Sequence, residues 1–164
     1  MRMPTGASSW SFTEQDQAAL SHVLQRFLFD SSARCALLVD RSGQLITVAG
    51  DRPTFDVTAF ATLTAADFSA NDQLARLIGE TDFNTLFHQG ERESMLLADV
   101  ARRVILVALF DNRTTLGLVR LKMRAIVDEL GRLIERSLQR SQDANPHRRP
   151  LLGDVDDEID RLFQ

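Results

Sequence analysis

The fold is decided by residues 103–138, which have the sequence RVILVALFDNRTTLGLVRLKMRAIVDELGRLIERSL. The stretch Val104–Phe110 is apolar without a break, a pattern typical of a central strand that is covered on both faces. The polar residues 111–115 interrupt it with side chains that turn the backbone and cap a helix. Apolar residues then recur at helical spacing, at positions 116, 119, 123, 126, 127, 130, 133 and 134. The segment contains no catalytic motif. It predicts only structural elements: a buried strand, a turn and a long amphipathic helix.

Composition and charge exclude several classes of protein. The 164 residues suit one domain with tails, and the net charge of −4 lies entirely in residues 154–164. The rest of the chain is neutral and has no basic stripe, which argues against nucleic-acid binding. No apolar run approaches the ~20 residues of a membrane span, and residues 1–11 lack the apolar core of a signal peptide. We therefore expect a cytoplasmic protein without membrane insertion.

Periodicity predicts helices over residues 12–29, 56–78 and 115–138, and Asp56 is of a residue type that can cap the second one. It predicts strands over residues 33–39, 44–49, 83–88, 94–100 and 103–110. The order is α-β-β-α-β-β-β-α. Because short links between successive strands force antiparallel neighbours, we expect an α/β sandwich (α+β) with a five-stranded antiparallel sheet and helices on both faces.

The chain divides into four parts. Residues 1–11 are predicted to be a disordered leader, residues 12–140 the folded domain and residues 141–150, with two prolines, a flexible linker. Residues 151–164 form an acidic segment that is either a disordered tail or a C-terminal recognition helix. Burying its apolar side chains contributes ~8–15 kcal/mol, and ordering the segment costs ~16 kcal/mol, so we expect it to be unstructured alone and to bind a groove weakly. Its apolar residues share one helical face: Leu152, Val155, Ile159, Leu162 and Phe163.

Signatures of catalysis are missing. The sequence has neither a phosphate-binding loop nor a dinucleotide fingerprint, so we expect no nucleotide bound by this chain. His22, His88 and His147 lack the spacing of metal ligands. Cys35 lies in a predicted strand, where a small core residue is the simpler interpretation. We therefore predict a non-catalytic protein with no cofactor and no metal.

The second predicted helix has two different faces. The larger apolar residues (60, 63, 70, 74, 77 and 78) are predicted to pack on the sheet. A second face presents Ala61, Ala65 and Ser69 with Thr58, Thr62 and Ala66 beside them. Small side chains let another backbone approach closely, so this face predicts an interface with a second copy or a partner. The alternative is a helix that is merely rich in good helix formers.

The order of elements and several segments resemble a known family. Leu37–Gly43 with the α-β-β-α-β-β-β-α order is similar to the Roadblock domain of the dynein light-chain family. The segments 63–65, 74–80, 87–90, 104–121 and 156–163 are similar to its bacterial branch that regulates gliding motility. The resemblance covers about residues 12–164.

The resemblance implies a homodimer that binds a small Ras-like GTPase and accelerates its GTP hydrolysis, in the control of cell polarity and at a cell pole. Two copies would join edge to edge, with the paired second helices facing the GTPase. The GTPase-facing residues would be Ala61, Ala65, Ser69 and Gln73. The family tends to carry smaller residues where this chain has Ser69, Asp72 and Gln73. The C-terminal helix would contact the GTPase elsewhere and affect nucleotide release.

Two mechanisms and two other functions remain open. Arg113 could be an arginine donated to the GTPase site, or a turn residue near the start of the third helix. In the second case activation would come from repositioning the switch loops of the GTPase, as the resemblance implies. The protein could also be a scaffold subunit that does not activate, or a sensory domain that binds a small molecule.

Overall fold

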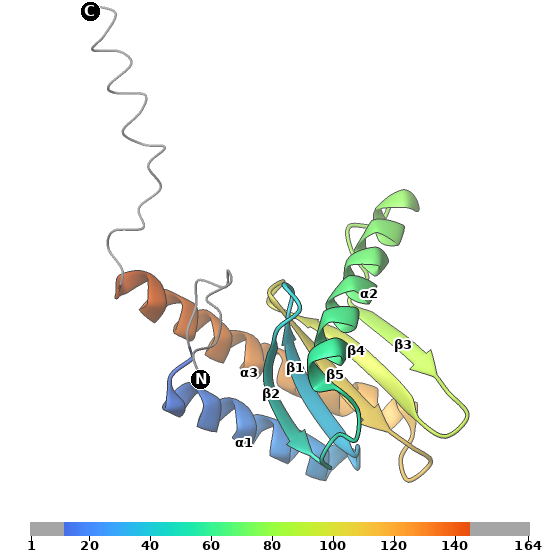
Figure 1. Cartoon of the computed structure of the whole chain (residues 1–164). Coiled ribbons are helices and arrows are strands. Elements are labelled where there is room, and N and C mark those ends of the chain that lie inside the picture. The colour runs from blue at the N-terminus through green and yellow to red at the C-terminus, as the bar shows by residue number, and fades with distance from the viewer. Residues whose placement is uncertain (1–11, 145–164) are drawn as a thin grey trace, which may run out of the picture.

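The computed structural model describes residues 12–144 (Figure 1). The elements follow the predicted order. The helices are α1 (Glu14–Ser31), α2 (Val57–Leu77) and α3 (Leu116–Asp143). The strands are β1 (Cys35–Asp40), β2 (Leu45–Gly50), β3 (Thr85–Gln89), β4 (Ser94–Val100) and β5 (Val104–Phe110).

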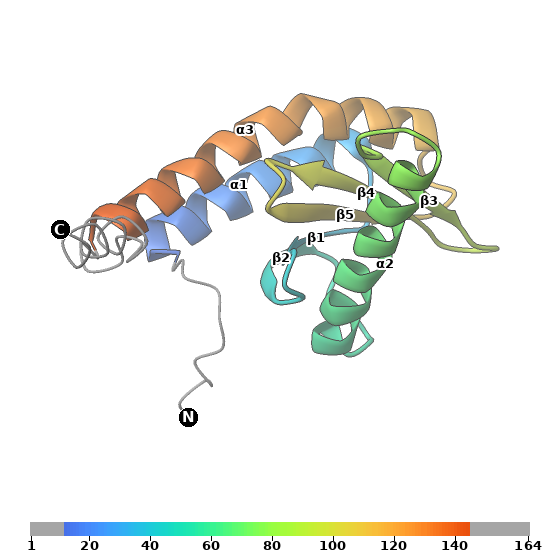
Figure 2. The same cartoon turned by 90° about the horizontal axis from the view of Figure 1, so that it is seen from above.

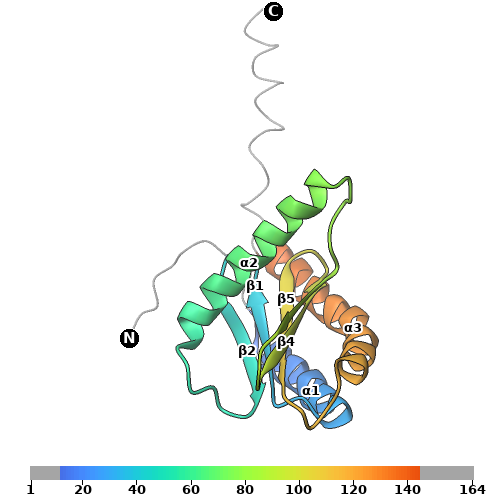
Figure 3. The ribbon, with the colours of Figure 1, turned by 90° about the vertical axis from the view of Figure 1, so that its right-hand side faces the viewer.

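The strands form one antiparallel sheet in the order β2-β1-β5-β4-β3. Figures 2 and 3 show α1 and α3 together on one face of the sheet and α2 alone on the other. This arrangement confirms the predicted five-stranded antiparallel sheet with helices on both faces. The edges are β2 and β3, and no helix of residues 12–144 has the length and apolarity needed to cross a membrane.

The apolar strand of the opening segment lies at the centre of the sheet. β5 pairs with both β1 and β4 and is buried along almost its whole length. Alternate residues therefore supply two separate cores. Leu106 and Phe110 face α1 and α3, and Ile105 and Val107 face α2. An uninterrupted apolar run is required because both sides of this strand are covered.

Capping side chains fix where the helices begin. Asp56 accepts hydrogen bonds from the N–H groups of Thr58 and Ala59, as its predicted role as a cap requires. Thr115 accepts a bond from the N–H of Leu118 and starts α3. In the turn before it, the Thr114 hydroxyl donates to the carbonyl of Ser31 over 2.6 Å. The predicted turn thus also joins the end of α1 to the start of α3.

α3 is longer than predicted. It ends at Asp143, so residues 141–143, predicted to begin the flexible linker, are helical. The last turns are held because Ser137 and Arg140 both donate to the Asp16 carboxylate at the start of α1. Ser141 donates to the carbonyl of Ser137. The predicted leader (1–11), residues 145–150 of the predicted linker and the predicted C-terminal helix (151–164) lie outside the described residues.

Candidate functional site

The face of α2 that packs on the sheet is the one with small residues. Ala61 is fully buried and Ala65 is 8% exposed, and the fully buried Phe68 ring belongs to the same core cluster as Ala61. The approach is close: a Cβ at Gly43, in the β1–β2 turn, would lie 3.3 Å from the Cα of Thr62. Small residues allow this contact because a larger side chain would hold the helix away from the strands.

The predicted assignment of the two α2 faces was therefore wrong, except for Phe60, which is partly buried against the core under α2. Leu63, Leu74, Leu77 and Ile78, predicted to pack on the sheet, are 69%, 57%, 82% and 70% exposed. Ala61 and Ala65 cannot serve as exposed contact residues in the single chain. Both faces have helical periodicity, and the sequence signal that distinguishes them is the large aromatic Phe68 among the small residues, three positions after Ala65.

The exposed face of α2 carries an apolar stripe with the spacing used for helix contacts. We call it the leucine stripe. Ser69 and Gln73, two of the predicted GTPase-facing residues, are exposed beside it. The leucine stripe consists of Ala59, Leu63, Ala66, Ala70, Leu74 and Leu77.

The leucine stripe lies near an open edge of the sheet. β3 is an edge strand, so one side of its backbone has no strand partner among the described residues. The ring Nε2 of His88 in β3 lies 2.7 Å from the carboxylate of Asp67 in α2. This pair joins α2 to β3, so the helix that carries the leucine stripe lies beside the open strand edge. The C-terminal end of α2 projects beyond the strands (Figure 1).

An ion cluster fixes the orientation of α2. The Arg41 guanidinium donates to Asp72 of α2 over 2.6 Å and to Asp99 of β4, and it lies 4.7 Å above the centre of the Phe68 ring. Burial by itself would lower the pKa of Arg41, but the hydrogen bonds to Asp99 and Asp72 outweigh it and raise that pKa. Asp72, noted as a departure from the family pattern, therefore ties α2 to the β1–β2 turn and to β4.

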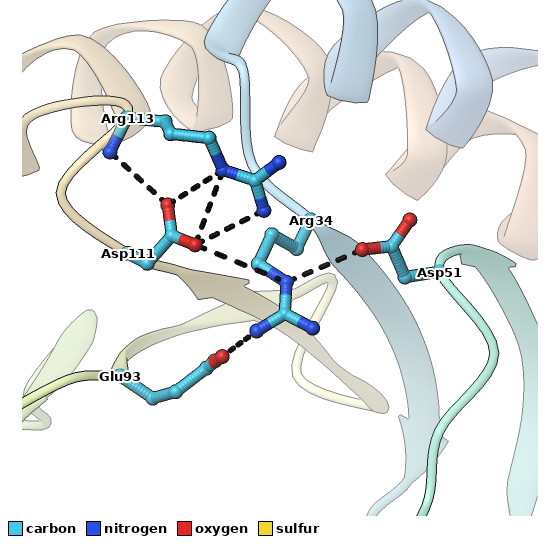
Figure 4. Close-up of polar contacts among 5 residues, drawn as sticks. All are labelled: Arg34, Asp51, Glu93, Asp111 and Arg113. Atoms are coloured by element: carbon cyan, nitrogen blue, oxygen red, sulfur yellow. Dashed lines mark hydrogen bonds and ion pairs between the residues drawn. The ribbon is translucent and has the colours of Figure 1, made fainter.

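Arg113 is paired within its own turn. Its side chain and its backbone N–H both donate to Asp111 (Figure 4). These hydrogen bonds are the main reason why the pKa of Asp111 is lowered. Arg34 lies beside this pair and contacts Asp51, Glu93 and Asp111. Arg113 thus belongs to a charged cluster that joins the chain segments at one end of the sheet.

The described residues 12–144 offer little for catalysis. No group of three histidine, cysteine or acidic residues among them could hold a metal ion. Cys35 is buried, and burial raises the pKa of its thiol to about 11. A thiol in this state is a poor nucleophile. The surface that stands out is therefore the leucine stripe with the β3 edge, which suits binding of another protein.

Comparison with known proteins agrees with this geometry. The Roadblock/LC7 domain family matches residues 20–110. MglB from Myxococcus xanthus is 41% identical, has a TM-score of 0.72, and the match covers 77% of this chain and 95% of that one. A gliding protein, MglB, from Thermus thermophilus is 30% identical with a TM-score of 0.74, covering 80% and 99%.

A further structure, described as MglB with a tetrameric arrangement, is also 30% identical, with a TM-score of 0.75 and coverage of 80% and 99%. No curated protein sequence is similar enough to count as a match. The residues matched by the family, 20–110, include α2, the β3 edge and the Arg41–Asp72–Asp99 cluster. On the family match and these similarities, the chain belongs to the Roadblock/LC7 domain family and is similar to MglB.

Proposed function

We propose that this chain is an MglB-like regulator that works as a homodimer. In this proposal it binds a small Ras-like GTPase of the MglA type and stimulates GTP hydrolysis by repositioning the switch loops of that GTPase. It performs no catalysis of its own. Its C-terminal segment modulates nucleotide exchange, and the pair acts in cell polarity and motility, at a cell pole. The supporting observation is the exposed leucine stripe beside an open sheet edge, in a chain 41% identical to MglB.

The homodimer would use the β3 edge and the leucine stripe together. Two β3 strands pairing across a two-fold axis would satisfy backbone groups that otherwise face solvent. The same axis would bring the two α2 helices close to each other. Burying Leu63, Leu74 and Leu77, each more than half exposed in the single chain, supplies the apolar contribution to that contact.

The GTPase would meet the α2 side of the dimer. Four residues were predicted from the sequence to face the GTPase. Two of them, Ser69 and Gln73, flank the leucine stripe and are exposed, so they can contact a partner. Their hydroxyl and amide side chains offer hydrogen-bonding groups to the partner. Ala61 and Ala65 act indirectly, because their small size sets how closely α2 approaches the sheet.

The pairing of Arg113 favours repositioning over a donated arginine. Its guanidinium is held by Asp111, and inserting it into another protein would break those hydrogen bonds. A GTPase can instead be activated when a partner binds its competent conformation more tightly than the others. On this view Arg113 stabilises the turn before α3.

The first experiment tests the surface. Leu74→Asp with Leu77→Asp places charges on the leucine stripe and should give a monomer in analytical ultracentrifugation and a loss of stimulated GTP hydrolysis. The matched control is Phe29→Asp on α1, since Phe29 is 87% exposed on the other side of the sheet. A dimer and full stimulation in the stripe variant would reject the proposed interface. Binding without any stimulation by the unmodified protein would indicate a scaffold.

The second experiment tests the mechanism. Arg113→Ala should leave both GTPase binding and stimulated hydrolysis close to the unmodified protein. If binding is preserved while the rate falls by the 10³–10⁵ typical of a donated arginine, repositioning is wrong. Deleting residues 150–164 should change nucleotide exchange and leave dimerisation intact. Unchanged exchange and affinity would remove the proposed role of the C-terminal segment.

A further inference from the structure

The helix layer that covers one face of the sheet stops before the last strand. α1 packs mainly over β2, and α3 packs over β4. A groove of about 580 Å³ therefore remains between α3 and the strands β3 and β4. Apolar side chains from both sides line it: Phe83 and Leu96 from the sheet side, and Met123 and Val127 from α3. Figure 3 shows α3 on this face of the sheet, opposite α2.

The rim of this groove carries two arginines without an ion-pair partner. Arg120 and Arg124 line the groove one helical turn apart. Neither forms a salt bridge with any residue in the described range 12–144. Two of the carboxylates that line the groove are already paired: Asp99 with Arg41, and Asp82 with Arg102 at 3.4 Å. Asp128 is the third carboxylate at the groove.

We propose that residues 151–164 of the same chain dock into this groove as a helix antiparallel to α3. On a helix, Leu152, Val155, Ile159, Leu162 and Phe163 share one face, which matches the apolar floor. Asp156 and Asp160 flank that face and lie four residues apart, the same spacing as Arg124 and Arg120. An antiparallel helix thus sets Asp156 against Arg124 and Asp160 against Arg120.

The remaining charges fit this register. With Asp156 opposite Arg124, the uncharged Leu152 lies level with Asp128. The other acidic residues, at positions 154, 157 and 158, point to the solvent side or to the opposite flank. Of the three charges at the groove that have no ion-pair partner within residues 12–144, two are cationic (Arg120 and Arg124) and one is anionic (Asp128). This balance favours binding of an acidic amphipathic helix.

The connecting segment is long enough for this path. From Ala144 back to the level of Asp128 is about 24 Å along α3, at 1.5 Å per residue. The chain from residue 144 to 152 spans about 25–28 Å when extended. The two prolines at 146 and 150 favour an extended backbone there. The segment therefore reaches the groove of its own chain.

Docking would occupy the apolar face of the segment and regulate its availability. If the proposed function holds, the docked segment is withheld from the GTPase until the partner competes for it. The docking itself involves this chain alone, and its test needs no GTPase. A failure of docking and a failure of GTPase activation are therefore distinguishable.

The experiment uses the full-length chain with a nitroxide label. Cys35→Ala removes the buried thiol and Gln164→Cys provides the attachment site. In this register Gln164 lies level with Leu116, so docking predicts the strongest loss of NMR intensity at the amides of residues 116–120. A weaker loss is expected further along the groove, at residues 121–124 and 83–85. Arg120→Glu with Arg124→Glu should restore the intensity, and adding Asp156→Arg with Asp160→Arg should remove it again. The matched control is Arg132→Glu with Arg136→Glu, two exposed arginines of α3 that do not line the groove.

Two further measurements decide the remaining outcomes. Ile159→Asp with Leu162→Asp leaves the described domain unchanged and should also restore the intensity, so a folding defect in the arginine variant does not obscure the result. Mixing labelled chains with separate isotope-enriched chains reveals docking between copies. Intensity loss only in the mixed sample, or equal intensities with and without the label, would overturn the proposal.

Discussion

The packing of α2 through its small residues predicts that enlarging one of them destabilises the protein. The change is Ala61→Leu. Ala61 is fully buried against the sheet, in the same apolar cluster as Phe68, Leu37 and Leu97. Leucine adds three carbon atoms where the helix and the strands are already in contact.

The expected cost follows from this lack of space. Overpacking a close-packed site costs about 1–3 kcal/mol. If α2 moves outward to accommodate the leucine, Phe68 loses part of its burial, and the cost rises toward the 3–5 kcal/mol of removing a buried aromatic ring. For a chain of this length each kcal/mol lowers the melting temperature by about 2–4 °C, so Ala61→Leu should lower it by at least 2 °C.

The assay is thermal and urea unfolding followed by circular dichroism, at several protein concentrations so that self-association is separated from folding. Ala125→Leu is the matched control, because it makes the same substitution at an exposed position of α3, outside the leucine stripe, and should change stability by less than about 0.5 kcal/mol. Equal stability of Ala61→Leu and the unmodified protein, with a large loss in Leu63→Ala, would refute the packing of α2 described above.

Three further predictions concern charged and titratable groups. Burial raises the pKa of Asp16, but hydrogen bonds from Thr13, Arg140 and Ser137 outweigh it and lower that pKa below 3.8. The ionised Asp16 therefore stabilises the fold fully above pH 3.8, and this stabilisation is lost as the pH falls through the lowered pKa of the folded protein. In Asp16→Asn this pH dependence is absent, so the stability measured below about pH 4 should fall less steeply with decreasing pH. Asp72→Ala should lower the free energy of unfolding, measured in urea, by about 1–2 kcal/mol, because it leaves the Arg41 guanidinium with one partner fewer. The same substitution should cost less in a protein that already carries Arg41→Met, because that protein has no cation to leave unpaired. Since the pKa of the Cys35 thiol is about 11, a thiol reagent at pH 8 should label the native protein far more slowly than the urea-unfolded chain.

Much of the fold could be predicted because its signals are local. The apolar run Val104–Phe110 indicates a strand covered on both faces, and β5 lies at the centre of the sheet. Asp56 was recognised as a helix cap from its residue type and position, and it caps α2. The candidate binding surface was only partly predictable. The helix was identified correctly, but its exposed and buried faces were exchanged.

The sequence by itself determined the order of the elements and the antiparallel sheet, since these depend on periodicity, turn residues and short connections. The family was indicated separately, by the resemblance of segments such as residues 104–121. The tertiary structure decided which face of α2 meets the sheet, because alanine and leucine stripes both satisfy helical spacing and only the close approach of the strands selects the smaller one. It also decided where α3 ends, through the contact of Ser137 and Arg140 with Asp16, more than a hundred residues away in the chain. Contacts between segments that distant have no local sequence signal, and they appear only when the helices pack.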